Sequence, residues 1–187
     1  MSKFNIHNLE TAPEASKGLL EQSLKSNGMI PGLHGVLAES PELFEAYQTL
    51  HKLFTQSSFN AEELTVVWQS INVEHECHYC VPAHTGIAHM MKVNPALTEA
   101  LRNGEQLTTE KLQVLQDTTL EIVRERGHLS EEQKEKFFAA GYENRHLLEI
   151  ILGLSQKVIS NYTNHLAKTP VDKAFEKFAW KKNTIKA

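Results

Sequence analysis

Cysteine is scarce in this chain of 187 residues, which contains only Cys77 and Cys80. Two cysteines three positions apart cannot join distant segments, so a disulfide-rich scaffold is excluded. The sequence also lacks a run of about 18 apolar residues, and we therefore predict no membrane span. Its first 20 residues contain no basic region followed by an apolar run. We therefore expect no secretory signal and a cytoplasmic location, where thiols stay reduced.

Charge of one sign is not concentrated anywhere along the chain. The formal net charge is -4, from 19 Lys and Arg against 23 Asp and Glu, and both signs are spread over the whole length. A nucleic-acid-binding domain normally shows a basic patch or stripe, so we predict no nucleic-acid partner. The hydrophobic fraction of 41% is enough for a sizeable core.

Alternating strand patterns are also missing, whereas apolar residues recur every three or four positions. We therefore predict an all-α protein, a single domain over residues 1–187 with a core at 28–172, an N-terminal arm at 1–27 and a C-terminal tail at 173–187. Apolar spacing and capping residues predict helices over residues 14–25, around 34–38, and over 110–126, 130–141 and 144–167. They also predict a helix that begins at 41, one that begins after 60, one from about 80 to before 95, and a short one in the tail.

The segment ECHYCVPAH holds both cysteines at the predicted start of a helix. Pro82 fits only a first helical turn, which places Cys80 at the helix N-terminus. Unpaired backbone N–H groups and the helix dipole at that position lower a thiol pKa. Cys77 lies close enough for a disulfide if the chain bends there.

A histidine stands one helical turn after the second cysteine. His84 shares a helix face with Cys80 and can accept or return a proton. Glu74 and Glu76 are both candidates to orient His84, and the sequence does not choose between them. No role is assigned to His75, His78 or His165.

The pattern leaves three interpretations open for the two cysteines. A redox pair is favoured, because both cysteines of a cytoplasmic chain fall in one CxxC. A zinc site is the second, with Cys77, Cys80, His84 and either His75 or His89 as ligands, although no second CxxC is present. Inert buried thiols are the third.

The stretch EHECHYCVPAHT resembles the signature of the carboxymuconolactone decarboxylase and alkylhydroperoxidase D superfamily, CxxCxxxH on an all-helical scaffold. It looks closest to a branch of uncharacterised peroxidase-related members with the form ENxCxYCxxAH. The stretches MIPGLHGVLAESPELFEAY, FFAAGYENRHLLEIILG and NYTNHLAKTPVD agree, so the resemblance spans about residues 28–172. Decarboxylase members lack the CxxC pair, which argues against lactone decarboxylation here.

The resemblance implies a role for each motif residue. Cys80 matches the peroxidatic thiol, Cys77 the resolving thiol and His84 the proton relay. Two further relay positions of the peroxidase members differ in this chain. The peroxidase members have a glutamate twelve residues before the first cysteine, where this chain has Thr65. They have a histidine just before the second cysteine, where this chain has Tyr79.

Glu74 stands where the peroxidase-related branch has its glutamate, and we take it as the partner of His84. The expected function is a thiol-dependent peroxidase or disulfide reductase acting on a small-molecule peroxide. It needs no organic cofactor and is restored by a thiol reductant or dithiol carrier protein. The family implies a homo-oligomer, a trimer or hexamer. A non-peroxidatic redox sensor or adaptor is the first alternative, and a zinc-binding structural protein is the second.

Overall fold

The computed structural model describes residues 4–182, and helices are the only regular secondary structure in that range. The all-α prediction is therefore confirmed. The outer ends of the predicted arm and tail, residues 1–3 and 183–187, lie outside the described residues. The elements are α1 (Glu14–Asn27), α2 (Gly32–Leu37), α3 (Pro41–Thr55), α4 (Ala61–Glu74), α5 (Cys80–Met90), α6 (Pro95–Asn103), α7 (Glu110–Arg124), α8 (Glu131–Ala139), α9 (Asn144–Ala167) and the 3-10 helix η1 (Lys173–Phe178).

Helix α6 is the element that the sequence analysis missed. Pro95 correctly marks the end of the preceding helix, which stops at Met90. The same proline also begins α6, and the side chain of Asn94 accepts a hydrogen bond from the Ala96 N–H. A proline at the first helical position needs no backbone donor, so one residue serves both purposes.

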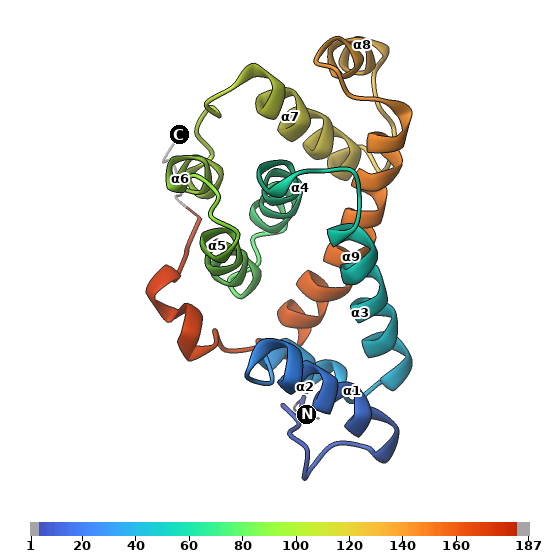
Figure 1. Cartoon of the computed structure of the whole chain (residues 1–187), viewed down its shortest axis with the longest axis vertical. Helices are drawn as coiled ribbons and strands as arrows, with labels where there is room; N and C mark the ends of the chain where they lie inside the picture. The colour runs from blue at the N-terminus through green and yellow to red at the C-terminus, as the bar shows by residue number, and fades with distance from the viewer. Residues whose placement is uncertain (1–3, 183–187) are drawn as a thin grey trace.

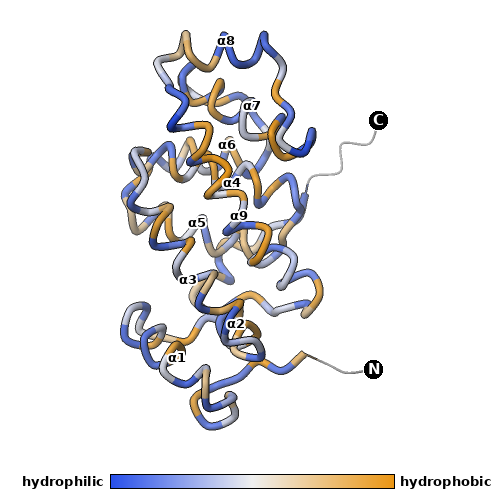
Figure 2. The backbone as a smooth tube through the Cα atoms, turned by 90° about the vertical axis from the view of Figure 1, so that its right-hand side faces the viewer, coloured by the Kyte–Doolittle hydropathy of each residue, from blue (hydrophilic) through white to orange (hydrophobic). Residues whose placement is uncertain are grey.

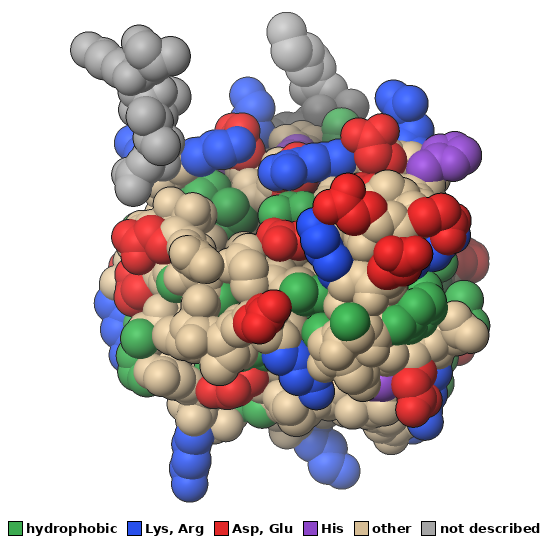
Figure 3. Space-filling view, turned by 90° about the horizontal axis from the view of Figure 1, so that it is seen from above, with side chains coloured by type: hydrophobic (Ala, Val, Ile, Leu, Met, Phe, Trp, Pro, Cys, Tyr) green, Lys and Arg blue, Asp and Glu red, His purple; other side chains and the backbone are tan. Residues whose placement is uncertain are grey.

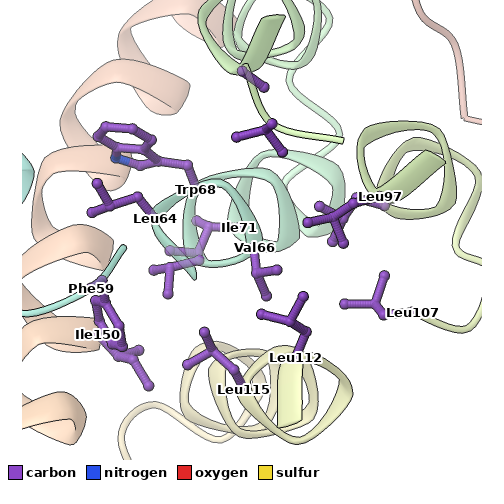
Figure 4. Close-up of a cluster of buried hydrophobic side chains, with 14 of the residues drawn as sticks. Phe59, Leu64, Val66, Trp68, Ile71, Leu97, Leu107, Leu112, Leu115 and Ile150 are labelled. Atoms are coloured by element: carbon purple, nitrogen blue, oxygen red, sulfur yellow. The ribbon is translucent and has the colours of Figure 1, made fainter. Parts of the chain in front are cut away.

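Helix α4 lies at the centre of the molecule, with α5, α6, α7 and α9 packed around it (Figure 1). Its side chains are buried on every side: Leu64, Val66, Trp68 and Ile71 point from α4 in different directions into the core (Figure 4). The helix also buries polar side chains, among them Gln69 and Asn72, which are fully buried on the part of α4 that leads to the cysteines. A capping box formed by Asn60 and Glu63 fixes where this central helix begins.

The molecule is elongated, with α8 at one end and α1 and α2 at the other (Figure 2). Leu20 of α1 is fully buried, and the His7 N–H donates to the Gly35 carbonyl, so the segment before α2 packs on the body. The end face beside α8 shows acidic and basic side chains interspersed (Figure 3). Within residues 4–182, no helix combines the length and apolar character that a membrane crossing requires.

Helix α9 buries the face that its sequence would assign to solvent. Of the apolar repeat that predicts this helix, Ile151, Tyr162 and Leu166 are exposed, as is the neighbouring Leu148, whereas Leu147 and Leu154 pack against the core. Its buried face is mostly polar and consists of Glu149, Ile150, Gly153, Gln156, Lys157, Ser160, Asn161 and Asn164. The polar part of this face lies against the two cysteines, which explains why it is polar.

Candidate dithiol site

A tight turn between α4 and α5 places Cys77. Helix α4 ends in a Schellman motif, in which the Glu76 N–H donates to the Val73 carbonyl and the Cys77 N–H to the Asn72 carbonyl. Glu76 adopts φ 52°, a left-handed conformation that costs a non-glycine residue about 1–2 kcal/mol. The turn brings Cys77 under the first turn of α5, where the Cys80 N–H donates to its sulfur at 3.2 Å.

Cys80 is the first residue of α5, as the position of Pro82 predicts. Both thiols are free and buried, with 0% of Cys77 and 2% of Cys80 exposed. The amide of Asn164, from α9, donates to the Cys80 sulfur at 3.3 Å. The dithiol is therefore enclosed between the start of α5 and the polar face of α9.

The surroundings of Cys80 favour its thiolate. Burial alone raises the pKa of Cys80, but this is outweighed by the hydrogen bond from Cys77, the charge of Lys157 and the amides of Asn164 and Asn161, so the pKa lies well below its usual value. The hydrogen bond to Cys80, followed by burial, raises the pKa of Cys77. The two shifts favour a thiolate at Cys80 and a protonated thiol at Cys77.

A buried lysine provides the positive charge of the site. Lys157 is 1% exposed, and its Nζ lies 2.8 Å from Nε2 of His84. Burial lowers the pKa of Lys157, while Cys80 and Cys77 raise it. Burial, then Lys157 and His51, hold the pKa of His84 well below its usual value.

The lowered pKa of His84 favours its neutral form beside Lys157. A neutral His84 accepts the Lys157 N–H at Nε2, so its own proton is on Nδ1. That Nδ1 is buried without a hydrogen-bond partner. The hydrogen-bond partner of His84 is thus Lys157 and not Cys80, with which the sequence paired it.

The structure does not bring Glu74 to His84. Both Glu74 carboxylate oxygens accept hydrogen bonds from Arg124 of α7, at 2.8 and 2.7 Å, and these bonds lower the pKa of Glu74. The last turn of α4 points Glu74 toward α7, away from the polar face of α9. Glu76 instead pairs with Lys182 at 2.8 Å.

The two positions that differ from the peroxidase pattern are structural here. Thr65 is buried and its hydroxyl donates to the Ala61 carbonyl of its own helix. The Tyr79 hydroxyl donates to Asp172 at 2.6 Å and accepts from the Leu33 N–H at 3.2 Å. Tyr79 thus ties the chain between the cysteines to α2 and to the C-terminal segment.

The remaining histidines of the motif point elsewhere. His75 Nδ1 lies 2.9 Å from the Asn161 amide oxygen, His78 Nε2 lies 3.0 Å from the Thr169 carbonyl, and His89 packs on the Phe178 ring. His165 is exposed. Among residues 4–182, no group of three or more His, Cys, Asp or Glu side chains is arranged to hold a metal ion. The zinc alternative therefore finds no ligand set in the described part of the chain.

Sequence reasoning missed Lys157 and the amides beside it. A signal for them exists, because polar residues recur in α9 at helical spacing, at 156, 157, 160, 161 and 164. That polar stripe has the same period as the apolar stripe beside it, so periodicity alone does not say which of the two is buried.

A surface hollow lies at the junction of α8 and α9. It is lined by Phe138, Tyr142, Glu143, Asn144 and Arg145 and contains none of the dithiol residues.

No family model and no curated protein sequence matches this chain. Solved structures do match over nearly its full length. A peroxidase-related protein from Ralstonia eutropha JMP134, described as an alkylhydroperoxidase AhpD core, superposes with a TM-score of 0.81 at 17% identity and covers 93% of this chain and 94% of its own. A peroxidase-related protein from Silicibacter sp. TM1040 gives 0.76 at 16% identity over 93% and 95%.

A protein with a different activity has a similar structure. The debrominase Bmp8 superposes with a TM-score of 0.77 at 16% identity, over 95% of this chain and 96% of its own. At these identities the likeness shows the fold. The chain therefore has the helical fold of the alkylhydroperoxidase AhpD core, as its sequence resemblance implied.

Proposed function

We propose that the protein is a thiol-dependent peroxidase in which Cys80 is the attacking thiolate and Cys77 resolves the oxidised product. One arrangement carries the proposal: Cys80 begins α5 with the Cys77 sulfur against its N–H, and the Asn164 amide and the charge of the buried Lys157 favour its thiolate. A thiolate, and not a thiol, is the nucleophile in such reactions. The fold shared with peroxidase-related proteins is consistent with this activity.

The first step consumes the peroxide. The Cys80 thiolate attacks one oxygen of the O–O bond, an S–O bond forms and the O–O bond breaks. The sulfur is oxidised to a sulfenic acid and the peroxide is reduced. The leaving alkoxide takes a proton from the Lys157 ammonium, whose pKa is lowered by burial, and departs as an alcohol.

The second step forms the disulfide. The Cys77 thiol attacks the sulfur of Cys80, and its proton leaves with the hydroxyl group as water. An external dithiol then exchanges with the disulfide and delivers two electrons and two protons. One proton returns to Cys77 and the other to Lys157, which restores the starting thiolate.

We assign His84 the task of holding the ammonium group. Its Nε2 accepts one N–H of Lys157 at 2.8 Å, which directs the remaining N–H groups of Lys157. A neutral imidazole is the form that can accept this bond, and its lowered pKa keeps it neutral. This assignment replaces the Glu74–His84 pair expected from the sequence.

The direct test is a thiol titration of the reduced full chain, before and after one equivalent of cumene hydroperoxide. We expect two thiols to disappear together and to return with dithiothreitol. Cys80→Ser should lose the fast reaction, and Cys77→Ser should stop at a sulfenic acid that dimedone traps. Two thiols that survive the hydroperoxide would refute the peroxidase function.

A redox sensor or adaptor is the second candidate, and the near-complete burial of both thiols favours it. Continuous consumption of hydroperoxide with excess dithiothreitol distinguishes the two candidates. Sustained turnover supports the peroxidase, while a single oxidation without turnover supports the sensor. The debrominase Bmp8 has a similar fold, and a variant of it was solved in complex with 2,3,4-tribromopyrrole. This compound is therefore a second electrophile to test against the two thiols.

We further propose that the protein is a homo-oligomer, a trimer or hexamer. The support is the exposed apolar stripe of α9, in which Leu148 is 68% and Leu166 71% exposed. Contiguous exposed apolar surface is typical of protein–protein contacts.

A further inference from the structure

One polar atom beside the dithiol has no partner within the described protein. Asn164 is fully buried in the last turn of α9, and its amide nitrogen donates to the Cys80 sulfur at 3.3 Å. Its amide oxygen, Oδ1, accepts no hydrogen bond from any group of residues 4–182. A buried polar atom without a partner is costly, and proteins retain few of them. A bound substrate with an O–H group can supply the missing donor.

The amide of Asn164 has one favourable orientation beside a thiolate. A negative sulfur accepts hydrogen bonds, so the amide nitrogen faces it and the oxygen takes the adjacent position. The standard C=O and C–N bond lengths place the two atoms of an amide about 2.2 Å apart, so Oδ1 lies at most about 5.5 Å from the Cys80 sulfur. An oxygen bonded to that sulfur is therefore within reach of an O–H···O hydrogen bond to Oδ1, which is about 2.7 Å long.

A hydroperoxide, R–O–O–H, has its hydrogen on the oxygen that the thiolate attacks. The S–O bond forms as the O–O bond breaks, the sulfur gives two electrons to the peroxide, and the hydrogen stays on the attacked oxygen. The alkoxide leaves from the other end with a proton from Lys157. Lys157 lies two turns before Asn164 on the same face of α9, and it pairs with His84, one turn after Cys80. The two α9 residues thus serve different oxygens of the peroxide.

We propose that Asn164 is a further catalytic residue: its N–H holds the Cys80 sulfur, and its Oδ1 accepts the O–H of the hydroperoxide while that oxygen is transferred to the sulfur. The same bond then holds the hydroxyl group of the sulfenic acid until Cys77 displaces it as water. The proposal rests on the proposed function, which assigns Cys80 as the attacking thiolate. A reagent without an O–H group gains nothing from Oδ1, so Asn164 gives the site a preference for hydroperoxides.

Two substitutions separate the two atoms of the amide. Asn164→Leu keeps a similar volume and removes both the N–H and the acceptor. Asn164→Asp removes the N–H and keeps an acceptor oxygen. Asn103→Leu makes the same chemical change at an exposed position of α6 and is the matched control. All three are made in the full-length Cys77→Ser chain, so that each reagent forms a single product on Cys80.

The readout is the ratio of two rate constants for Cys80, one with cumene hydroperoxide and one with methyl methanethiosulfonate. The second reagent has no O–H or N–H group and also reacts with the thiolate, so the ratio does not depend on how much thiolate a variant holds. We expect Asn164→Leu to lower the ratio about tenfold, the effect of one hydrogen bond in the transition state. Asn164→Asp should keep the ratio of the parent chain although both of its rates fall, and Asn103→Leu should change neither rate.

The outcomes separate this inference from the proposed function. An unchanged ratio in Asn164→Leu would overturn the role of Oδ1, because the amide would then act on the thiolate alone. A ratio that falls as far in Asn164→Asp would also overturn it, since the acceptor is still present there. A parent chain that reacts with methyl methanethiosulfonate but not with the hydroperoxide would instead refute the proposed function. Thermal unfolding shows whether each variant is folded, and Asn164→Asp tests the acceptor even if the leucine variant is not.

Discussion

Lys157 explains, at the scale of single residues, how a fully buried sulfur can remain charged. An ammonium group that loses its water is costly unless an opposite charge or hydrogen bonds compensate. Here the Cys80 thiolate and His84 supply that compensation, and each of the three groups limits the protonation of the other two. The proposed ion pair of Lys157 and Cys80 is thus enclosed in the protein, where the Asn164 amide also donates to the sulfur.

The variant Lys157→Met tests this ion pair. Methionine is similar in length and uncharged, so we expect the pKa of Cys80 to rise and its alkylation by iodoacetamide at pH 7 to slow at least about tenfold. Stability in urea should fall, because removing one partner of a buried charge pair leaves the other group and the His84 acceptor uncompensated. Lys52→Met, at an exposed position of α3, is the matched control. A variant that reacts as fast as the unaltered chain would contradict the role of Lys157.

The pH dependence of alkylation follows from the direction of the Cys80 shift. Because the pKa of this acid is lowered, the thiolate is present at neutral pH and takes up a proton only as the pH falls through the lowered pKa. We expect the rate with iodoacetamide to be nearly constant from pH 9 to pH 7 and to fall in acid. An ordinary thiol, with a pKa of about 8.5, would lose rate about tenfold per unit below that pH, and such a profile would refute the shift.

At the scale of elements, the C-terminal segment, residues 169–182, controls how α5 begins. It contacts three residues next to the cysteines, Glu76, His78 and Tyr79. Asp172 accepts a hydrogen bond from Tyr79, the Thr169 carbonyl faces His78, and Lys182 pairs with Glu76. Its η1 part packs along α5 (Figure 1). Since both thiols are buried, we expect reagents to reach them when this segment opens.

Gly86 of α5 gives a test of that packing. A Cβ at this position would lie 2.5 Å from the Phe175 ring, too close for two carbons. We expect Gly86→Ala to displace η1 and lower the free energy of unfolding by about 1–3 kcal/mol, as overpacking does. In a Phe175→Ala background, the same change should stabilise by up to about 1 kcal/mol, the helix preference of alanine over glycine.

Urea unfolding of the four chains in this cycle gives the coupling between the two positions. The rate of iodoacetamide alkylation of Cys80 should rise in Gly86→Ala, because the covering segment is loosened. A Gly86→Ala chain that is more stable than the unaltered one would show that η1 does not restrain α5.

At the scale of the whole molecule, the two faces of α9 have separate tasks. The inner face carries the polar groups of the dithiol site, while the outer face presents an apolar stripe along nearly the whole helix. A helix that contributes to a site on one side and leaves apolar residues on the other fits an associating protein.

Sedimentation tests this association. We expect the unaltered chain to sediment as a trimer or hexamer, and Leu148→Glu or Leu166→Glu to shift it toward monomer, because a buried unpaired charge opposes association. Cys80 alkylation should persist in both variants if the site is complete within one chain. Lys52→Glu, on α3, is the control for added negative charge. A monomer at all protein concentrations would contradict the oligomer.

The sequence alone determined the local features of this protein. Capping and breaking residues such as Asn60, Pro82 and Pro95 place helix ends, because caps and proline act through the adjacent backbone. The same local reasoning puts Cys80 at the start of α5, where the structure has it. Periodicity likewise predicts α9 at 144–167, as the structure bounds it.

Tertiary structure decided which side chains meet. Periodicity gives a helix two faces but does not say which one is buried, and in α9 the polar face is inside. Lys157 reaches His84 across 73 positions of sequence, and Arg124 takes Glu74 across 50. Such pairs depend on how helices pack, and packing is set by the summed burial of many residues. The sequence therefore specified the dithiol, and only the packed helices placed the buried lysine whose charge favours the Cys80 thiolate.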